Sequence, residues 1–312
     1  MSICSKTFFY TFTFLKNFII STETHIATIQ KEPIRFQDYG AGIFVGIATK
    51  SALKKAIKKG LIYIDEKKAS TATFIKGAEK ITYYKPEENR NKKKLELKLD
   101  VVYQDNFLAI INKPAGILVS GNSFKTIDNA LEQNIKKSNL PDATKPRPVH
   151  RLDYPTTGLL IIGKTSTSIL ALNKLFENKE ITKTYLAVTI GKMPVKGIIN
   201  TMVDNKKALS KYTVIKSITS TKYAHLNLVK LNPETGRKHQ LRVHLSSIGN
   251  PILGDHEYGI PEKILKGKGL YLHAYSISFI HPFTNEKMSF KIEPHKKFNK
   301  LFPSHIYSDF QL

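Results

Sequence analysis

The stretch that decides the fold is HRLDYPTTG at residues 150–158, followed by the apolar run LLII at residues 159–162. It places the carboxylate of Asp153 beside Arg151 and His150 in a proline-containing turn, and the apolar run predicts a buried strand directly after that turn. A carboxylate in this position is either a local structural clamp or a reactive group. The stretch alone leaves both interpretations open.

Apolar segments on both sides of the turn predict strands interrupted by a few helices. Residues 99–103 and 107–111 flank the turn QDN and predict a β-hairpin, which KPAG at residues 113–116 ends. We expect further strands at residues 184–190, 211–218 and 223–231, an extended segment at 145–148, and helices at 127–135, 168–178 and 239–247. No fixed-period repeat is present. The pattern predicts an α+β fold with a mixed, mostly antiparallel sheet and flanking helices.

A smaller unit is expected ahead of this sheet, at residues 34–84. Ser51 is a suitable N-cap for a helix that places Leu53, Ala56 and Ile57 on one face and ends at Gly60. Strands are predicted at residues 61–64 and 80–84. The unit should therefore be a small α/β domain consisting of one helix and a hairpin.

The opposite face of the predicted helix carries Lys54, Lys55, Lys58 and Lys59. A lysine-rich helix followed by glycine, a short strand and a turn resembles the RNA-binding domain named after a ribosomal small-subunit protein. That resemblance implies that the four lysines contact RNA. A solvated charged helix face is the alternative interpretation.

The domain boundaries follow from changes in composition. Residues 85–98 begin with a run of polar, charged and proline residues and predict a linker between the small unit and a catalytic domain at residues 99–312. Residues 1–33 form an N-terminal extension. Its apolar segment at residues 8–20 is interrupted by polar residues, falls short of the roughly 20 residues of a membrane span, and lacks a small-residue cleavage site. A signal peptide is the alternative.

The charge of the chain points to a polyanionic partner. There are 49 Lys and Arg residues against 25 Asp and Glu residues, which gives a formal net charge of +24. This excess favours nucleic acid over an anionic membrane surface as the partner. The single cysteine, Cys4, excludes an internal disulfide and a thiolate metal cluster, and it fits the cytoplasm. We expect a monomer.

Several classes of catalytic site do not fit the motifs. His239 and His244 are five residues apart, whereas the two histidines of a zinc-binding HExxH helix are four apart. The glycines do not form a P-loop or a dinucleotide-binding pattern, and there is no GxSxG nucleophile elbow. We therefore expect neither a metal nor a cofactor. The chemistry falls to carboxylate, phenol and guanidinium groups.

Three residues of these types stand out. Asp153 lies in the turn described above, Tyr185 follows Lys183 at the start of an apolar strand, and Arg242 lies within GRKHQLRVH at residues 236–244. Taken singly, each has a structural explanation: a turn-capping Asp, a strand-edge Tyr and a helix-surface Arg.

Their order along the chain resembles the RluA-type pseudouridine synthases. The patterns are HRLDxxT[ST]G, KxYxA and GRxHQ[IL]RVH, supported by KPAG at residues 113–116, PILGD at 251–255 and YG at 258–259. The similarity spans about residues 95–290. Thr157 replaces the more common Ser, and Tyr154 with Pro155 replaces the usual polar pair, so both departures concern substrate fit more than activity.

The resemblance implies an isomerase that converts uridine in RNA to pseudouridine. Asp153 would be the essential carboxylate, Arg242 its salt-bridge partner, and Tyr185 the phenol that stacks on the uracil ring. Arg151 would fill the space left by the flipped uridine or hold a phosphate, and His150 would order the turn. Besides the four lysines of the small unit, the residues expected to contact substrate or RNA are His150, Arg151, Lys113, Arg237, His239 and Gln240.

Ribosomal RNA, in particular that of the large subunit, is the expected substrate, and transfer RNA is the alternative. Two other functions are compatible with parts of the sequence. A non-catalytic RNA-binding or ribosome-assembly factor would not need Asp153, Tyr185 and Arg242 together. A carboxylate-dependent nucleoside hydrolase would need a second acid near Asp153.

Overall fold

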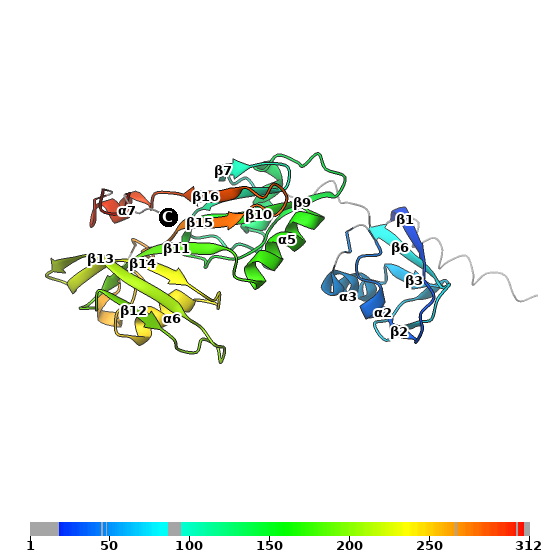
Figure 1. Ribbon diagram of the computed structural model, residues 1–312, viewed down its shortest axis with the longest axis horizontal. Coiled ribbons are helices and arrows are strands. Elements are labelled where there is room, and N and C mark those ends of the chain that lie inside the picture. Colours follow the sequence, from blue (N-terminus) through cyan, green and yellow to red (C-terminus); the bar gives the residue numbers. More distant parts are fainter. Residues whose placement is uncertain are drawn as a thin grey trace, which may run out of the picture. The chain divides into compact units, whose positions relative to one another are not determined.

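The computed structural model describes residues 19–44, 46–47, 49–86, 95–265, 267–303 and 305–308. The chain divides into two compact units between residues 93 and 94, and each is described here by itself (Figure 1). Most of the apolar segment predicted at residues 8–20 and residues 87–94 of the predicted linker lie outside the described residues.

The first unit is a small sheet with helices packed on it. Its sheet has the antiparallel order β1-β6-β3-β4, and a separate two-stranded ladder pairs β2 with β5. The elements are β1 (Ile19–Ile26), β2 (Ile34–Arg35), α2 (Phe36–Tyr39), α3 (Lys50–Lys58), β3 (Ile62–Ile64), β4 (Lys67–Lys68), β5 (Phe74–Ile75) and β6 (Lys80–Pro86). Strand β1 lies before residue 34, so the sheet begins earlier in the chain than the predicted unit.

Helix α3 shows the predicted amphipathic pattern but a different N-cap. Leu53 and Ala56 are buried in the core of the unit. The N-cap is Thr49, whose hydroxyl accepts a hydrogen bond from the backbone N–H of Ala52 at 3.1 Å. The prediction of Ser51 was wrong because Thr49 already adopts the extended backbone that a cap requires, so the helix starts at Lys50.

The second unit is built on one long sheet, as the α+β prediction required. Its strands follow the order β12-β13-β14-β11-β15-β10-β8-β7, with β16 added to β15 and β9 to β10. The strands are β7 (Asp100–Gln104), β8 (Leu108–Lys113), β9 (Ala143–Pro148), β10 (Thr157–Thr165), β11 (Thr182–Ile190), β12 (Lys196–Ile199), β13 (Ser210–Ser220), β14 (Ala224–Pro233), β15 (Leu272–Ile280) and β16 (Lys287–Lys291). Among these pairings only β10 with β15 is parallel, so the sheet is mostly antiparallel.

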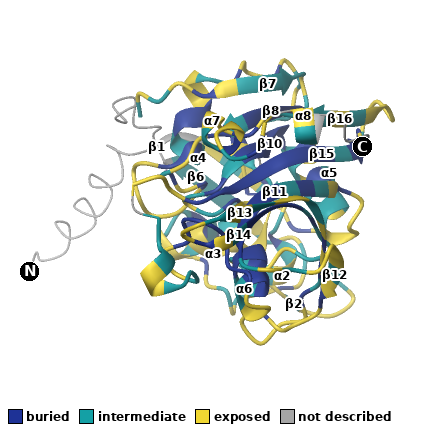
Figure 2. Ribbon diagram, turned by 90° about the vertical axis from the view of Figure 1, so that its left-hand side faces the viewer, coloured by how far each residue is buried: buried dark blue, intermediate teal, exposed yellow. Residues whose placement is uncertain are grey.

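Helices cover this sheet and complete its core. They are α4 (Ile127–Ala130), α5 (Ser166–Glu177), α6 (Gln240–Ser247), α7 (Lys296–Asn299) and α8 (His305–Ser308), with 3-10 turns at Leu131–Gln133 and Pro261–Lys263. Figure 1 shows α5 beside β9 and β10, and α6 at the end of the unit that carries β12. Figure 2 shows that the central strands β10 and β15 are buried.

The predicted helix at residues 127–135 is shorter than expected. Helix α4 ends at Ala130 and passes into a single 3-10 turn. The side chain of Asn134 donates hydrogen bonds to the carbonyl oxygens of Ala130 and Leu97, both at 2.8 Å. A side chain therefore satisfies a carbonyl that a further helical turn would have used.

Strands β10 and β15 approach each other closely just after the HRLD turn. Gly158 pairs with Ala274, and a Cβ atom at residue 158 would lie 2.3 Å from the Ala274 oxygen and 2.6 Å from its nitrogen. Gly158 also has a φ of +116°, which L side chains rarely adopt. The strand that follows the HRLD turn therefore requires glycine at this position.

We predict that Gly158→Ala lowers the free energy of unfolding of the second unit by roughly 2–4 kcal/mol, because it adds both strain and a backbone clash. Gly121→Ala is the matched control, since Gly121 has a φ of +140° and nothing lies within 4 Å of the place that a Cβ atom would take there. Chemical denaturation of both variants measures the difference. Equal losses would show that backbone strain alone, and not the β10–β15 contact, limits residue 158.

Candidate active site

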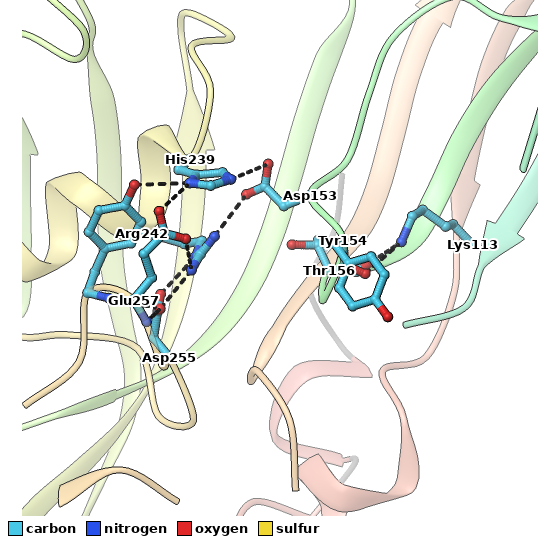
Figure 3. A network of polar contacts seen from close by, with 9 residues as sticks. Lys113, Asp153, Tyr154, Thr156, His239, Arg242, Asp255 and Glu257 are labelled. Atoms are coloured by element: carbon cyan, nitrogen blue, oxygen red, sulfur yellow. Dashed lines mark hydrogen bonds and ion pairs between the residues drawn. The ribbon is translucent and has the colours of Figure 1, made fainter. Parts of the chain in front are cut away.

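Asp153 lies in a turn whose backbone is held from several directions. The Asp153 carbonyl accepts a hydrogen bond from the N–H of Thr156 at 3.1 Å, and the Tyr154 carbonyl accepts one from the N–H of Gly116 at 2.9 Å. Leu152 is buried in the core beneath the turn. The carboxylate of Asp153 is directed toward the facing residues of the 236–258 region (Figure 3).

Lys113 ties this turn to the end of strand β8. Its side chain is 0% exposed, and its ammonium group donates to the carbonyl oxygens of Pro114 at 2.9 Å, Tyr154 at 3.3 Å and Thr156 at 2.8 Å (Figure 3). Burial lowers the pKa of Lys113 to about 8, while the charge of Asp153 acts in the opposite direction. The ammonium group of Lys113 is enclosed and already hydrogen-bonded, so in this structure it anchors the turn. Its contact with RNA stays a prediction.

Arg242 projects from α6 toward Asp153, but its closest partner is another acid. Its Nε and Nη2 atoms each lie 2.8 Å from an oxygen of Asp255, and Nη2 lies 3.2 Å from Glu257. The Nη1 atom is 4.0 Å from Oδ2 of Asp153. The guanidinium is therefore fixed by Asp255 and presents its remaining nitrogen to Asp153 (Figure 3).

The loop after α6 supplies the acidic residues that hold Arg242. Asp255 is buried and also accepts the backbone N–H groups of Glu257 at 3.0 Å and Tyr258 at 3.1 Å. Burial opposes ionisation of Asp255, but the hydrogen bonds from Arg242 and the backbone outweigh it and lower its pKa. The Arg242 guanidinium lies 4.9 Å from the centre of the Tyr258 ring. The motifs PILGD and YG include Asp255 and Tyr258 in the family pattern, but the role of these two residues could not be predicted from the motifs.

A ring nitrogen of His239 also lies near Asp153. It is the N-cap of α6 and has a left-handed backbone, with φ of 55°. Its Nε2 atom lies 3.8 Å from Oδ1 of Asp153, and its Nδ1 atom lies 3.0 Å from the Tyr258 hydroxyl and 3.4 Å from Glu257. Figure 3 shows the imidazole directed toward the Asp153 carboxylate.

A cavity of about 570 Å³ contains two of the three residues that the sequence singled out for catalysis. Asp153 and Tyr185 both line it, together with Arg151, Arg237 and His239. Burial, assisted by the negative charge of Asp153, raises the pKa of Tyr185 well above its ordinary value, so the phenol is neutral. Arg242 does not line the cavity, although its Nη1 atom lies 4.0 Å from Oδ2 of Asp153. Arg151 and Arg237 are exposed at the surface.

Gln240 has an internal role. Its amide nitrogen donates to the Leu209 carbonyl at 3.0 Å and the Ser210 hydroxyl at 2.9 Å. Its amide oxygen accepts from the Thr235 hydroxyl at 2.7 Å and the Arg237 N–H at 3.0 Å. Gln240 lines the cavity, and its polar atoms hold the 235–237 loop against the start of β13. Its contact with RNA stays a prediction.

His150 orders the strand after the turn. Its Nε2 atom accepts the backbone N–H of Ile161 at 2.9 Å, and its ring packs 4.8 Å from that of Phe176. Burial, with a smaller contribution from Lys183, lowers the pKa of His150 to about 3, so the ring is neutral. This geometry fits the predicted ordering role rather than a cationic contact to RNA.

The described part of the chain contains neither a candidate metal site nor a candidate membrane-spanning helix. No group of three or more His, Cys, Asp or Glu side chains there is arranged to hold a metal ion. No helix within those residues combines the length and apolar character of a membrane span.

The sequence and fold of the chain are similar to those of proteins named as RNA pseudouridine synthases. Residues 107–247 match the family described as RNA pseudouridylate synthase. A relative from Aquifex aeolicus, named uncharacterized RNA pseudouridine synthase, is 32% identical and covers 81% of this chain and 88% of its own length. The dual-specificity RNA pseudouridine synthase RluA of Haemophilus influenzae is 33% identical, covering 63% of this chain and 93% of its own.

Two further comparisons agree. The ribosomal large subunit pseudouridine synthase C of Rickettsia conorii is 32% identical and covers 74% of this chain and 84% of its own length. The structure of human RNA pseudouridylate synthase domain containing 4 aligns with a TM-score of 0.52 at 27% identity, covering 66% of this chain and 92% of that one.

The sequence matches and the shared fold thus identify an isomerase, an RNA pseudouridine synthase. The chain belongs to the RNA pseudouridine synthase family and is of the RluA type, which confirms the resemblance seen in its motifs.

The neutral state of His150 makes a prediction about acid stability. Unfolded histidine takes up a proton near its ordinary pKa of 6.5, whereas the pKa of folded His150 is about 3. The folded state therefore binds fewer protons between these values and loses stability as pH falls through this window. Between pH 7 and pH 4 we expect the wild type to lose roughly 2–3 kcal/mol more than His150→Gln, which cannot titrate. Urea denaturation at both pH values measures this, and parallel losses would contradict a buried neutral His150.

Proposed function

We propose that this pseudouridine synthase modifies specific uridines of large-subunit ribosomal RNA, and that Asp153 is its essential carboxylate. The observation that carries the proposal is the position of Asp153, which lines the same cavity as the neutral phenol of Tyr185 and faces His239 and Arg242. Relatives named ribosomal large subunit pseudouridine synthase C and D support ribosomal RNA as the substrate.

The reaction suits a carboxylate in this setting. The bond from C1′ of the ribose to N1 of uracil breaks, the base turns, and C1′ joins C5, after which the C5 proton leaves and N1 gains one. The conversion is redox-neutral. An ionised carboxylate can attack C1′, add to the ring, or abstract a ribose proton, and each route uses the charged form of Asp153. The guanidinium of Arg242 lies 4.0 Å and a ring nitrogen of His239 lies 3.8 Å from that carboxylate, so both can act on charge that develops during the reaction.

Tyr185, Arg151 and Arg237 would bind the target uridine and the RNA around it. The raised pKa keeps the Tyr185 hydroxyl protonated, so its ring can stack on uracil beside Asp153 without placing a second anion there. Removing the target uridine from its stack costs a few kcal/mol. Exposed Arg151 at the cavity can fill the vacated position or bind a phosphate, and Arg237 can bind a neighbouring phosphate.

The essential role of Asp153 can be tested by tritium release from RNA labelled at C5 of uridine. We expect Asp153→Asn to reduce release from large-subunit ribosomal RNA by at least roughly 100-fold, because the amide can neither attack nor accept a proton. Asp204→Asn is the matched control, since Asp204 is exposed in the same unit. Full activity of Asp153→Asn would exclude this carboxylate from the reaction.

The same assay with transfer RNA separates the two substrates. We expect wild-type release from ribosomal RNA to exceed that from transfer RNA. Equal or greater tritium release from transfer RNA would contradict ribosomal RNA as the preferred substrate and favour transfer RNA. No release by wild type from either RNA would favour a binding or assembly role.

The first unit is proposed to bind RNA through helix α3. Lys54, Lys55, Lys58 and Lys59 are all exposed, and the first three line a shallow hollow with Lys50. Their apolar neighbours Leu53 and Ala56 are buried, so the lysine face is oriented outward by the core. A row of cations fixed on one helix face is suited to neutralising RNA phosphates.

Replacing Lys54, Lys55, Lys58 and Lys59 together by Ala should weaken RNA binding and make it less sensitive to salt. Each lost phosphate contact should reduce the slope of log K against log salt by roughly 0.7. Filter binding at several salt concentrations measures the slope. Replacing the exposed Lys31, Lys67, Lys76 and Lys80 removes the same charge from other parts of the unit. Equal effects of the two sets would show that net charge, and not the α3 face, governs binding.

A further inference from the structure

An aromatic side chain is exposed immediately after the proposed catalytic carboxylate. Tyr154 is 54% exposed, although its neighbours Leu152 and Thr156 are buried. We propose that Tyr154 is a stacking platform for an unpaired base of the RNA next to the target uridine, and so a residue that determines substrate specificity. The proposal rests on the assignment of Asp153 as the reactive group.

The backbone at Tyr154 is held by two hydrogen bonds. The Tyr154 carbonyl accepts hydrogen bonds from the N–H of Gly116 at 2.9 Å and from the Lys113 ammonium group at 3.3 Å. The Tyr154 side chain therefore projects from the same hydrogen-bonded turn that carries Asp153.

The two neighbouring side chains point in different directions. Figure 3 shows the Asp153 carboxylate directed toward His239 and Arg242, whereas the Tyr154 ring lies on the side of the turn that carries Lys113. Tyr154 also does not line the cavity that holds Asp153 and Tyr185. The ring is therefore outside the pocket for the flipped uridine, where the flanking nucleotides of the RNA must continue.

The loop that contacts Tyr154 through Gly116 has a composition that suits RNA. This loop, residues 114–126, contains no acidic residue and exposes Leu118 at 37%, Phe124 at 49% and the cation Lys125. A combination of apolar and basic groups without carboxylates binds unpaired bases by stacking and phosphates by charge. Tyr154 thus lies next to a loop that carries no negative charge.

The alternative role for Tyr154 is to pack against the loop at residues 114–126. Its hydroxyl lies 3.9 Å from the position that a Cβ atom would take on Gly116, so the ring does contact this loop. Leucine retains an apolar cover but has no π-face. Comparison of Tyr154→Leu with Tyr154→Phe therefore separates packing from stacking.

The test measures tritium release by the full chain from C5-labelled ribosomal RNA isolated from cells that lack the enzyme. We expect Tyr154→Leu to raise the half-saturating RNA concentration roughly 10-fold, with the rate at saturation changed less than about 2-fold. Tyr154→Phe should behave like the wild type. Leu170→Ala is the control, because Leu170 is also exposed but lies on α5.

Ultraviolet crosslinking of the same RNA, with mass spectrometry of the peptides, gives a readout that does not depend on turnover. We expect an RNA adduct on the peptide at Tyr154 and its loss in Tyr154→Leu. Wild-type RNA affinity and turnover in Tyr154→Leu would overturn the proposal. A Tyr154 adduct without any wild-type tritium release would instead contradict the proposed catalytic function while retaining the stacking contact.

Discussion

The ammonium group of Lys113 is the interaction on which the site depends. Its hydrogen bonds to the carbonyl oxygens of Pro114, Tyr154 and Thr156 join the end of β8 to both sides of the Asp153 turn. An unpaired buried carbonyl is costly, and the hydrogen bond from Lys113 to the Thr156 carbonyl is itself buried. The same turn then enters β10, whose Gly158 permits the close parallel contact with β15. One buried cation therefore positions the carboxylate relative to the sheet.

The opposite wall of the site is organised by a carboxylate that does not line the cavity. Asp255 holds Arg242 with two hydrogen bonds of 2.8 Å, which leaves Nη1 of Arg242 at 4.0 Å from Asp153. A closed salt bridge would occupy the Asp153 oxygens, whereas a fixed cation at this separation stabilises the negative charge and leaves the oxygens accessible. Oriented charges of this kind favour charged transition states because they need not reorganise during the reaction.

The sequence predicted those features that depend on neighbouring residues. The β7–β8 hairpin, helix α5 and strand β11 are confirmed, because alternating or clustered apolar residues and turn residues encode them locally. The N-cap of α3 and the length of α4 were wrong. Both ends are decided by single side-chain hydrogen bonds, from Ala52 to Thr49 and from Asn134 to Ala130, which residue type alone does not reveal.

Sequence alone was sufficient to identify the family and to single out Asp153, Tyr185 and Arg242, since their motifs occur in a characteristic order. It was not sufficient to separate RNA-facing residues from internal ones. Lys113 and Gln240 are polar and lie within these motifs, yet both are buried with their polar atoms paired. Burial and partners arise from segments far apart in the chain, such as β8 against the Asp153 turn and α6 against the loop at Asp255. Only the tertiary structure brings these segments together and so decides which polar group faces the substrate.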